Sequence, residues 1–508
     1  MPRFYIENFG CRAAQADGAA MERQFLDRGL EHAAVASDAE IVVLNTCTVT
    51  EGADKDARAS IRRLQRVNPV CRILVTGCYA QRAPEELAAL PGVTWVVGNS
   101  HKHQAAEIAT SSFPHAGSSS SSSGFVPLGQ LSLGQLPKNR LSGDQSNNVF
   151  VGDIFAHTEL LAAPVFEAAN QRTRPNLKVQ DGCDNRCSFC VIPYVRGQSR
   201  SLPRERVIAE VRTLVEAGYR EVVISGINLG RWGRDLEVVG RQSLVVGKQN
   251  PSTSAISKSE PPESHRERLT TNDQRLVDLV RAILDRTSLQ KLRISSVEPM
   301  DWSDELIDLV AASGRIAKHA HVPMQSGSDA VLRRMHRKYR PWHYREKVLK
   351  IRSAMPTAAI GADVMVGFPG ETEVEFAETR RMIEELPFTY LHVFTYSARP
   401  GTPAAEQPRQ IPIAVARERN RVLREIASKK KAAFMRSLVG TVVEAITLQS
   451  GGAEFTEALT DNYLKMRISG HHEANRWMAL SVDGVDGEML VGRPVASLLT
   501  GELSPSTQ

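Results

Sequence analysis

The sequence predicts an α/β protein with an N-terminal Rossmann-like α/β domain, a partial (β/α)6 barrel of the TIM type and a small C-terminal β-barrel. Short Ile- and Val-rich segments alternate with helical patterns near the N-terminus, and this alternation returns six times after residue 176. Six repeats are too few for a closed eightfold barrel but suit a partial one. From residue 439 the chain changes to short alternating segments, which are typical of a small barrel.

The N-terminal part is expected to form a parallel sheet. Strand-like segments at 4–8, 40–47 and 72–78 are separated by helical patterns at 19–28 and 53–67. Cys11, Cys47 and Cys78 each stand at or after the end of such a segment. The carboxyl ends of parallel strands share one edge of a sheet, so these cysteines are expected to converge there.

The middle and last parts follow the same logic. Predicted strands of the partial barrel lie at 177–180, 221–226, 291–297, 318–324, 360–367 and 390–396. Predicted helices lie at 204–217, 276–286, 304–312, 329–338, 344–353 and 373–384, and a long basic helix spans 415–438. The tail strands are predicted at 440–448, 455–460, 464–470, 477–484 and 489–499.

Two segments interrupt this order. Residues 111–170 contain the run SSSSSS and cannot bury enough apolar surface to order themselves, so a flexible linker or insertion is expected. A second insertion is predicted at 238–272 as a surface loop. The predicted domains are therefore 1–110, the linker 111–170, the barrel 171–436 with its insertion, and the tail barrel 437–501.

Composition sets the broad class. The chain has 508 residues, of which 42% are hydrophobic and 24% charged, as in ordinary soluble proteins. No apolar run reaches the length of a membrane span, and the N-terminus lacks a signal-peptide pattern, so no membrane partner and a cytoplasmic location are expected. The net charge of +6 permits nucleic-acid binding without requiring it.

The seven cysteines indicate metal ligation. Their number is odd, and a reducing compartment disfavours disulfides. Cys183, Cys187 and Cys190 form a CxxxCxxC motif, whose thiolates can bind three irons of a cubane cluster and leave the fourth iron open. The alternative is structural zinc, which needs four ligands. No cysteine follows Cys190, and His319 or His321, which could complete such a site, are better explained as barrel residues.

The segment VQDGCDNRCSFCVIPYVRG, with Phe189 before the third cysteine, resembles the radical S-adenosylmethionine superfamily. The resemblance implies that the open iron holds the amino and carboxylate groups of S-adenosylmethionine. It also implies that one electron from a 4Fe–4S cluster cleaves the sulfonium to give a 5′-deoxyadenosyl radical. The cofactor would carry the difficult chemistry, and the protein would orient it and exclude solvent.

Three further segments, FGCRAAQAD, LNTCTVTEGADKDAR and VTGCYAQR, make the whole chain resemble the methylthiotransferase family. The resemblance implies that Cys11, Cys47 and Cys78 hold a second 4Fe–4S cluster, which carries the transferred sulfur. Cys71 matches no ligand position and is expected to be a buried small side chain. Ala14 stands where the family usually has Asn, which puts a hydrogen bond near the cluster in doubt.

Within this family, GCR, QDGCDNRCSFCVIPYVRG and ISSVEP most resemble the branch that acts on N6-threonylcarbamoyladenosine at tRNA position 37. One sister branch acts on isopentenyladenosine and another on an aspartate of a ribosomal protein, and both remain alternatives. Two molecules of S-adenosylmethionine are expected per product: one methylates the sulfur, and the other yields the radical that abstracts hydrogen from C2 of the adenine. No side chain is singled out as a general acid or base.

Residues that contact S-adenosylmethionine are also implied by the resemblance. Ser225, Gly226 and Asn228 would meet its methionine end. The ribose would be held by Gln325 and Ser326, and the adenine edge by Asp363 and Gly367. Without the family, each segment reads as an ordinary Gly-rich turn.

Basic and aromatic residues suggest how RNA could be held. In the stretch 332–347, arginines and lysines are interleaved with Tyr339, Trp342 and Tyr344, a pattern that suits phosphate contact and base stacking, although a solvated helix face is the alternative. The tail resembles the RNA-binding TRAM barrel, and the KKKAAFMR segment before it could contact phosphates. Arg399 is expected to face the substrate or a cluster, or else to be a surface residue. Arg196 and Arg399 are candidate partners of the threonylcarbamoyl carboxylate.

The expected partners are the anticodon stem-loop of tRNA and an electron donor such as flavodoxin or ferredoxin. A non-catalytic alternative is an RNA-binding protein with structural metal centres, whose metal no small ligand could approach.

Overall fold

The computed structural model describes residues 1–111, 148–157, 160, 173–236, 274–452 and 454–495. The first part is a six-stranded sheet whose paired strands run parallel, in the order β2-β1-β3-β4-β5-β6. Its strands are β1 (Arg3–Asn8), β2 (Glu31–His32), β3 (Ile41–Thr46), β4 (Arg72–Gly77), β5 (Val93–Gly98) and β6 (Val149–Phe150). Its helices are α1 (Arg12–Asp27), α2 (Glu51–Val67), α3 (Cys78–Arg82), α4 (Pro84–Ala88) and α5 (Ala105–Thr110), with 3-10 turns at η1 (Ala36–Asp38) and η2 (Lys102–Gln104).

The interior of this domain explains its sheet. All six residues of β3 are buried, as expected for a central parallel strand with apolar cores on both faces. Cys71 lies in one of these cores, as expected for a buried small side chain. The short strand β6 falls inside the range predicted as a linker. Val149 and Phe150 pair with Val96 and Val97, so in this stretch the chain completes the sheet instead of linking domains.

The second part is a partial barrel of six parallel strands built from two sheets, β10-β9-β7-β8 and β11-β12-β13. Single bridges from Leu292 to Ile316 and from Ser296 to His321 connect the two sheets. The strands are β7 (Asn176–Asp181), the antiparallel β8 (Arg200–Ser201), β9 (Glu221–Gly226), β10 (Lys291–Ile294), β11 (His319–His321), β12 (Ala359–Val366) and β13 (Tyr390–Thr395).

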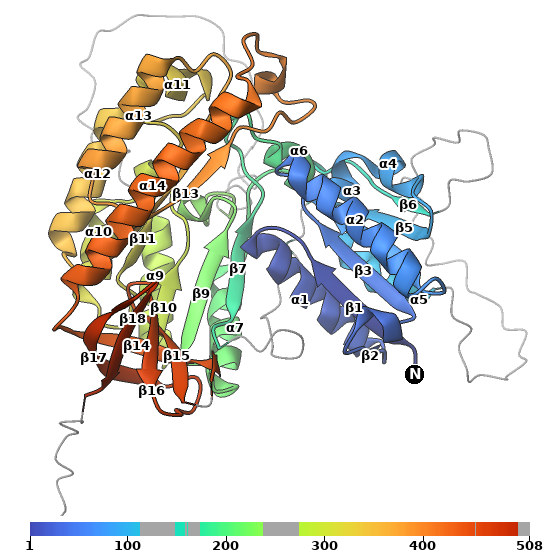
Figure 1. The fold of residues 1–508 in the computed structure, drawn as a ribbon. Helices are drawn as coiled ribbons and strands as arrows, with labels where there is room; N and C mark the ends of the chain where they lie inside the picture. The colour runs from blue at the N-terminus through green and yellow to red at the C-terminus, as the bar shows by residue number, and fades with distance from the viewer. Residues whose placement is uncertain (112–147, 158–159, 161–172, 237–273, 453, 496–508) are drawn as a thin grey trace, which may run out of the picture.

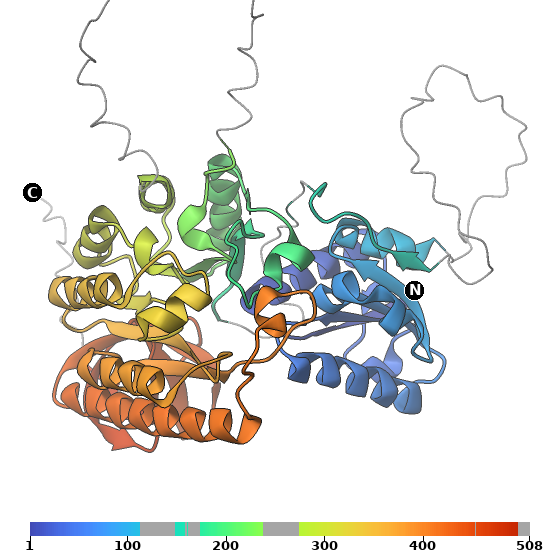
Figure 2. The same ribbon diagram turned by 90° about the horizontal axis from the view of Figure 1, so that it is seen from above.

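Helices cover the outside of this arc, as Figure 2 shows, and one large apolar core lies between helices and strands. The helices of this part are α6 (Ile192–Arg196), which packs against α3, and α7 (Arg204–Glu216), α9 (Gln274–Arg286), α10 (Asp304–Ala312), α11 (Asp329–Arg334), α12 (Pro341–Ala354), α13 (Glu373–Glu385) and α14 (Ile413–Ser437), with 3-10 turns η3 (Leu229–Arg231), η6 (Pro299–Asp301) and η7 (Pro403–Glu406). The helix predicted at 329–338 ends at Arg334, and His336 then turns the chain with a φ of 57°.

The last part is a closed five-stranded barrel in the order β14-β15-β16-β18-β17, which confirms the predicted tail barrel. Its strands are β14 (Val442–Gly451), β15 (Phe455–Thr460), β16 (Lys465–Ser469), β17 (Trp477–Asp486) and β18 (Met489–Pro494). The tail barrel packs beside the amino-terminal ends of β9 and β10 (Figure 1), where Lys291 Nζ lies 2.7 Å from Glu444 and Arg293 donates to Asp461 O at 3.0 Å.

The α/β class, the partial barrel and the tail barrel are thus as predicted. Most of the predicted linker, 111–170, and the predicted insertion, 238–272, lie outside the described residues. Among those described, no helix combines the length and apolar character needed to cross a membrane.

Candidate active site

The CxxxCxxC loop follows β7 and is held tightly by backbone contacts. Gly182 has a φ of 70°, and a Cβ there would lie 1.9 Å from the carbonyl oxygen of Gln198, so only glycine fits. The Cys183 N–H donates to Gly197 O at 3.0 Å, and Ser188 donates through its N–H to Met335 O at 3.1 Å. These backbone contacts hold the loop in a defined conformation.

The three thiols of this loop lie close enough to affect one another. Burial raises the pKa of Cys190 to about 12, and the neighbouring Cys187 and Cys183 add to the shift. Donors point at the sulfurs: Arg337 Nη1 lies 3.3 Å from Cys187 Sγ, and Asn228 Nδ2 lies 3.7 Å from Cys183 Sγ. Crowded thiols with N–H donors around them fit an iron–sulfur cluster, which takes thiolates and is tuned by such bonds.

The second group of thiols forms at the edge of the N-terminal sheet. Cys11 precedes α1, Cys47 follows β3, and Cys78 begins α3 after β4. Burial raises the pKa of Cys47 to about 11, and Cys78 and Cys11 add to this rise. Gly10, with a φ of 96°, lies against Cys47, since a Cβ there would be 2.8 Å from its Sγ.

Asn99 supports this second group, because its Nδ2 lies 3.6 Å from Cys78 Sγ and 2.7 Å from Val195 O. The structure therefore brings Cys11, Cys47 and Cys78 to one place, as the strand pattern indicated, and links them to α6 of the barrel. Their role as ligands, like that of the loop cysteines, stays a prediction.

A buried ion network lies between the two cysteine groups. Arg196 donates to both carboxylate oxygens of Asp181 at 2.9 Å and to Asp17 at 2.8 Å. Lys178 contacts both carboxylates, and Lys102 donates to Asp17 at 2.9 Å. All five side chains are buried. Burial opposes ionisation of Asp17, but Lys102, Lys178 and Arg196 outweigh it and hold its pKa below the usual range.

This network corrects one expectation. Arg196 was a candidate partner of a substrate carboxylate, yet its Nη1 and Nη2 already donate to two carboxylates of the protein. Arg399 is likewise buried and donates through Nη2 to Asp54 and to Thr48 Oγ1, so it is not a surface residue, and its contact with a substrate or a cluster stays a prediction. Both arginines instead join the barrel to the N-terminal domain.

The residues expected at the methionine end of S-adenosylmethionine lie together after β9. The Asn228 N–H donates to Gln180 Oε1 at 2.7 Å, and Gly226 lies against the same glutamine. Ser225 Oγ and Asn228 Oδ1 are buried without a hydrogen-bond partner in the described structure. Since buried polar atoms are nearly always paired, these two fit a polar ligand beside Cys183.

The residues expected at the ribose and adenine already make hydrogen bonds within the protein. Gln325 has a φ of 63°, and its N–H donates to Asp363 O at 2.8 Å. Ser326 Oγ is 3.1 Å from Thr379 Oγ1 and accepts from the Ser328 N–H, so its hydroxyl is occupied inside the protein. Gly367 donates its N–H to Glu371 at 2.7 Å. Their cofactor contacts stay predictions.

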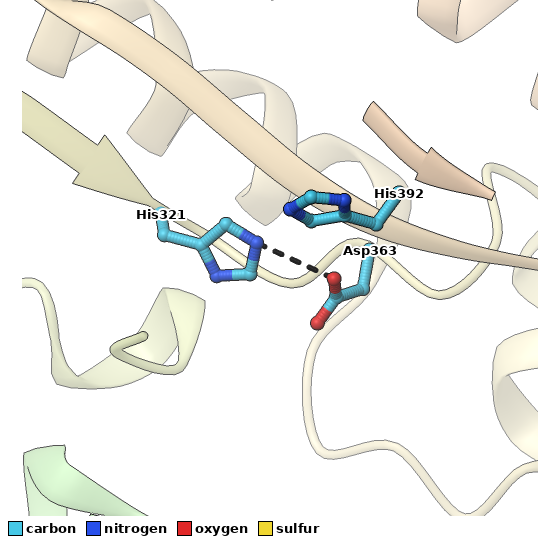
Figure 3. Close-up of side chains that lie close together, drawn as sticks. All are labelled: His321, Asp363 and His392. Carbon is cyan, nitrogen blue, oxygen red and sulfur yellow. Dashed lines mark ion pairs between the residues drawn. The ribbon is translucent and has the colours of Figure 1, made fainter. Parts of the chain in front are cut away.

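The side chain of Asp363 points into a cluster that the sequence did not single out (Figure 3). His321 Nε2 is 3.3 Å from Asp363 Oδ1, and His392 faces the same carboxylate from β13. His321 Nδ1 lies 3.0 Å from Ser296 Oγ. The usable signal was the alternation in HAH and LHV, which sends His321 of β11 and His392 of β13 to the face that Asp363 occupies on β12, the strand between them.

The basic and aromatic stretch at 332–347 differs from its prediction. Tyr339 and Tyr344 are buried and donate their hydroxyls to the carbonyls of Met324 and Val322 at 2.7 Å, so neither can stack on a base. Arg337 is buried beside Cys187 and Glu298. Trp342 alone of the three rings is exposed, at 56%.

Two family models match this chain: the Radical SAM superfamily over residues 177–383, and Uncharacterized protein family UPF0004 over residues 3–98. The partial barrel with its cysteine loop therefore defines a radical S-adenosylmethionine enzyme.

Similar proteins identify the family within this class of enzymes. The chain is 34% identical to the threonylcarbamoyladenosine tRNA methylthiotransferase MtaB of Bacillus subtilis (strain 168), over 92% of this chain and 90% of that protein. It is 31% identical to the protein of the same name from Aquifex aeolicus (strain VF5), over 93% and 98%. It is also 31% identical to the tRNA-2-methylthio-N(6)-dimethylallyladenosine synthase of Erythrobacter litoralis (strain HTCC2594), over 89% and 87%. The chain belongs to the tRNA methylthiotransferase family.

Proposed function

We propose that this enzyme adds a methylthio group at C2 of N6-threonylcarbamoyladenosine at position 37 of tRNA. The observation that carries the proposal is the pair of three-cysteine groups, one in each of two domains that a buried ion network joins. Two relatives that align with nearly the whole chain bear the name of this activity. Three thiols per group leave one iron of each cubane open, as both sulfur delivery and S-adenosylmethionine binding require.

Each part of the chain has its task in this proposal. A cluster on the barrel loop supplies one-electron cleavage of S-adenosylmethionine when bound. Cys183, Cys187 and Cys190 hold that cluster, and Asn228 and Arg337 donate to its ligands. Cys11, Cys47 and Cys78 hold the second cluster. The backbone conformations of Gly10 and Gly182 keep the two cysteine groups in place for binding the clusters.

The proposed function also assigns residues that contact S-adenosylmethionine, the tRNA and the electron donor. Ser225, Gly226 and Asn228 bind the methionine end of S-adenosylmethionine, where two buried polar atoms lack partners. Gln325, Ser326, Asp363 and Gly367 border its nucleoside. The anticodon stem-loop contacts the tail barrel and the exposed ring of Trp342, and a flavodoxin or ferredoxin supplies the electron.

A second candidate substrate is isopentenyladenosine in tRNA. The relative from Erythrobacter litoralis, whose name gives a dimethylallyladenosine product, aligns over a similar share of the chain. Methylthiolation of a ribosomal-protein aspartate is a further alternative.

The test is nucleoside analysis with matched variants. A strain lacking the gene is expected to lose methylthiolated threonylcarbamoyladenosine from its tRNA by mass spectrometry, and the wild-type gene restores it. Cys187→Ala is expected to remove roughly four of roughly eight irons per chain and all restoration. Cys71→Ala changes a core residue away from both cysteine groups, and this variant is expected to keep the full iron content and the restoration. Loss of the isopentenyl product instead would establish the second candidate.

A further inference from the structure

A cavity of about 530 Å³ opens where the three domains meet, on the tail-barrel side of the partial barrel. Arg12 and Gln15 of α1 line one wall, Arg174 and Asn176 line the next, and Ser450 and Tyr463 of the tail barrel close it. Its volume accommodates a modified nucleobase with an acyl group, because small-molecule sites span roughly 300–1,000 Å³. Each domain thus contributes polar groups to one space.

Arg12 differs from the other arginines near this space. Arg174 and Arg293 both pair with Glu221, at 3.5 and 2.6 Å. Arg12 is half-buried, and Nη2 donates to Tyr463 Oη at 3.3 Å. Within the described part of the chain, no carboxylate lies at ion-pair distance from Arg12.

The charge of Arg12 also reaches the barrel interior. Burial lowers the pKa of His392, and Arg12 lowers it further although Asp363 opposes this. Burial also lowers the pKa of His319, and Arg293, His321 and Arg12 act in the same direction. The guanidinium, which lines the cavity, therefore also lies near enough to β11 and β13 for its charge to act on their histidines.

The position of Arg12 in the chain gives it a chemical meaning, if the proposed function holds. It directly follows Cys11, a ligand of the cluster proposed to deliver sulfur to C2. In adenine, C2 and C6 are both bonded to N1, so the N6 substituent projects from the ring edge that carries C2. A side chain that reads this substituent must therefore lie close to that cluster.

We propose that Arg12 is a specificity-determining residue that binds the carboxylate of the N6-acyl group, held in place by Tyr463. A threonylcarbamoyl group carries a carboxylate, whereas an isopentenyl group is neutral and hydrophobic. A half-buried guanidinium without a carboxylate partner favours the first and disfavours the second, which would leave the cation unpaired. This inference rests on the proposed function and extends it to the choice of substrate.

The test uses two anticodon stem-loop RNAs that differ in one group: the threonyl carboxylate is free in one and a carboxamide in the other. Reconstituted full-length holoenzyme is assayed for Kd by fluorescence anisotropy without reductant, and for kcat/KM by mass spectrometry. The wild type is expected to prefer the carboxylate RNA by about 10- to 100-fold. Arg12→Gln brings the ratio to about 1, and Arg12→Lys gives an intermediate ratio.

Arg28→Gln, an exposed arginine after the same helix, is the matched control and keeps the wild-type ratio. Two results overturn the proposal. One is a wild type that does not distinguish the two RNAs, a result that does not depend on whether any variant folds. The other is an Arg12→Gln variant that binds both RNAs more weakly by the same factor. Equal weakening would assign Arg12 to a backbone phosphate. A third RNA that carries isopentenyladenosine separates failure of the proposed function from failure of this inference: a wild type that methylthiolates neither threonylcarbamoyl RNA, or only this third RNA, refutes the proposed function itself.

Discussion

Replacing Asp17 by Asn tests whether the buried network holds the two cysteine domains together. The network contains Lys102, Lys178 and Arg196 against Asp17 and Asp181, and thus carries one excess positive charge. The substitution keeps the shape of the side chain but raises the excess to two charges. Removing one partner from a buried ion pair costs about 3–5 kcal/mol, which is a large share of a typical total stability of roughly 5–15 kcal/mol.

The assay is equilibrium unfolding in urea of the cluster-free protein under anaerobic conditions. The midpoint of Asp17→Asn is expected to fall well below that of Asp27→Asn, an exposed aspartate at the end of the same helix. Adding Lys178→Met to Asp17→Asn should recover part of the loss, because the two groups interact directly. A loss no larger than the control, or strict additivity in the double variant, would refute the reasoning.

Three further predictions concern the clusters. Arg337→Met removes the donor to Cys187. The variant should have a more negative reduction potential at the barrel cluster and should release 5′-deoxyadenosine about 10- to 100-fold more slowly. An unchanged potential in an electron paramagnetic resonance titration contradicts this prediction. Asn228→Ala should raise the Kd for S-adenosylmethionine by about tenfold, measured by equilibrium dialysis, and an unaltered Kd would show that its amide makes no contact. In cluster-free protein, Cys47 and Cys190 have a pKa raised by burial to about 11 and about 12, so the folded state holds more protons than the unfolded one above about pH 9. Stability should therefore fall as pH rises from about 9 to about 12, and replacing both cysteines by serine should flatten this slope.

The sequence allowed much of the architecture to be predicted because hydrophobic period and cysteine spacing are local signals. The strands at 221–226 and 360–367 stand within a residue of their predicted limits. Cys11, Cys47 and Cys78 could be placed together because parallel strands end at a shared edge. β6 was missed because a strand of two residues is too short to show a period.

The surroundings of individual charged and aromatic side chains could not be predicted from such local signals. Arg196 and Arg399 looked available because their partners, Asp17 and Asp54, lie 179 and 345 positions away in the chain. Tyr339 and Tyr344 looked like stacking rings because the stretch is basic, yet the chain turns after Arg334 and directs both rings into the core. Burial of a particular side chain depends on such packing, which composition does not encode.

The pairing of Asp17 with Lys178 and Arg196 also bears on how the chain folds during synthesis. A ribosome that has just added Asp17 needs on the order of ten to thirty seconds to reach residue 196. Until then, of the three cations that contact this carboxylate, only Lys102 and Lys178 have been made. Because Lys178 and Arg196 lie in the first strand and the first helix of the barrel, the buried network around Asp17 is completed only after these elements have been synthesised.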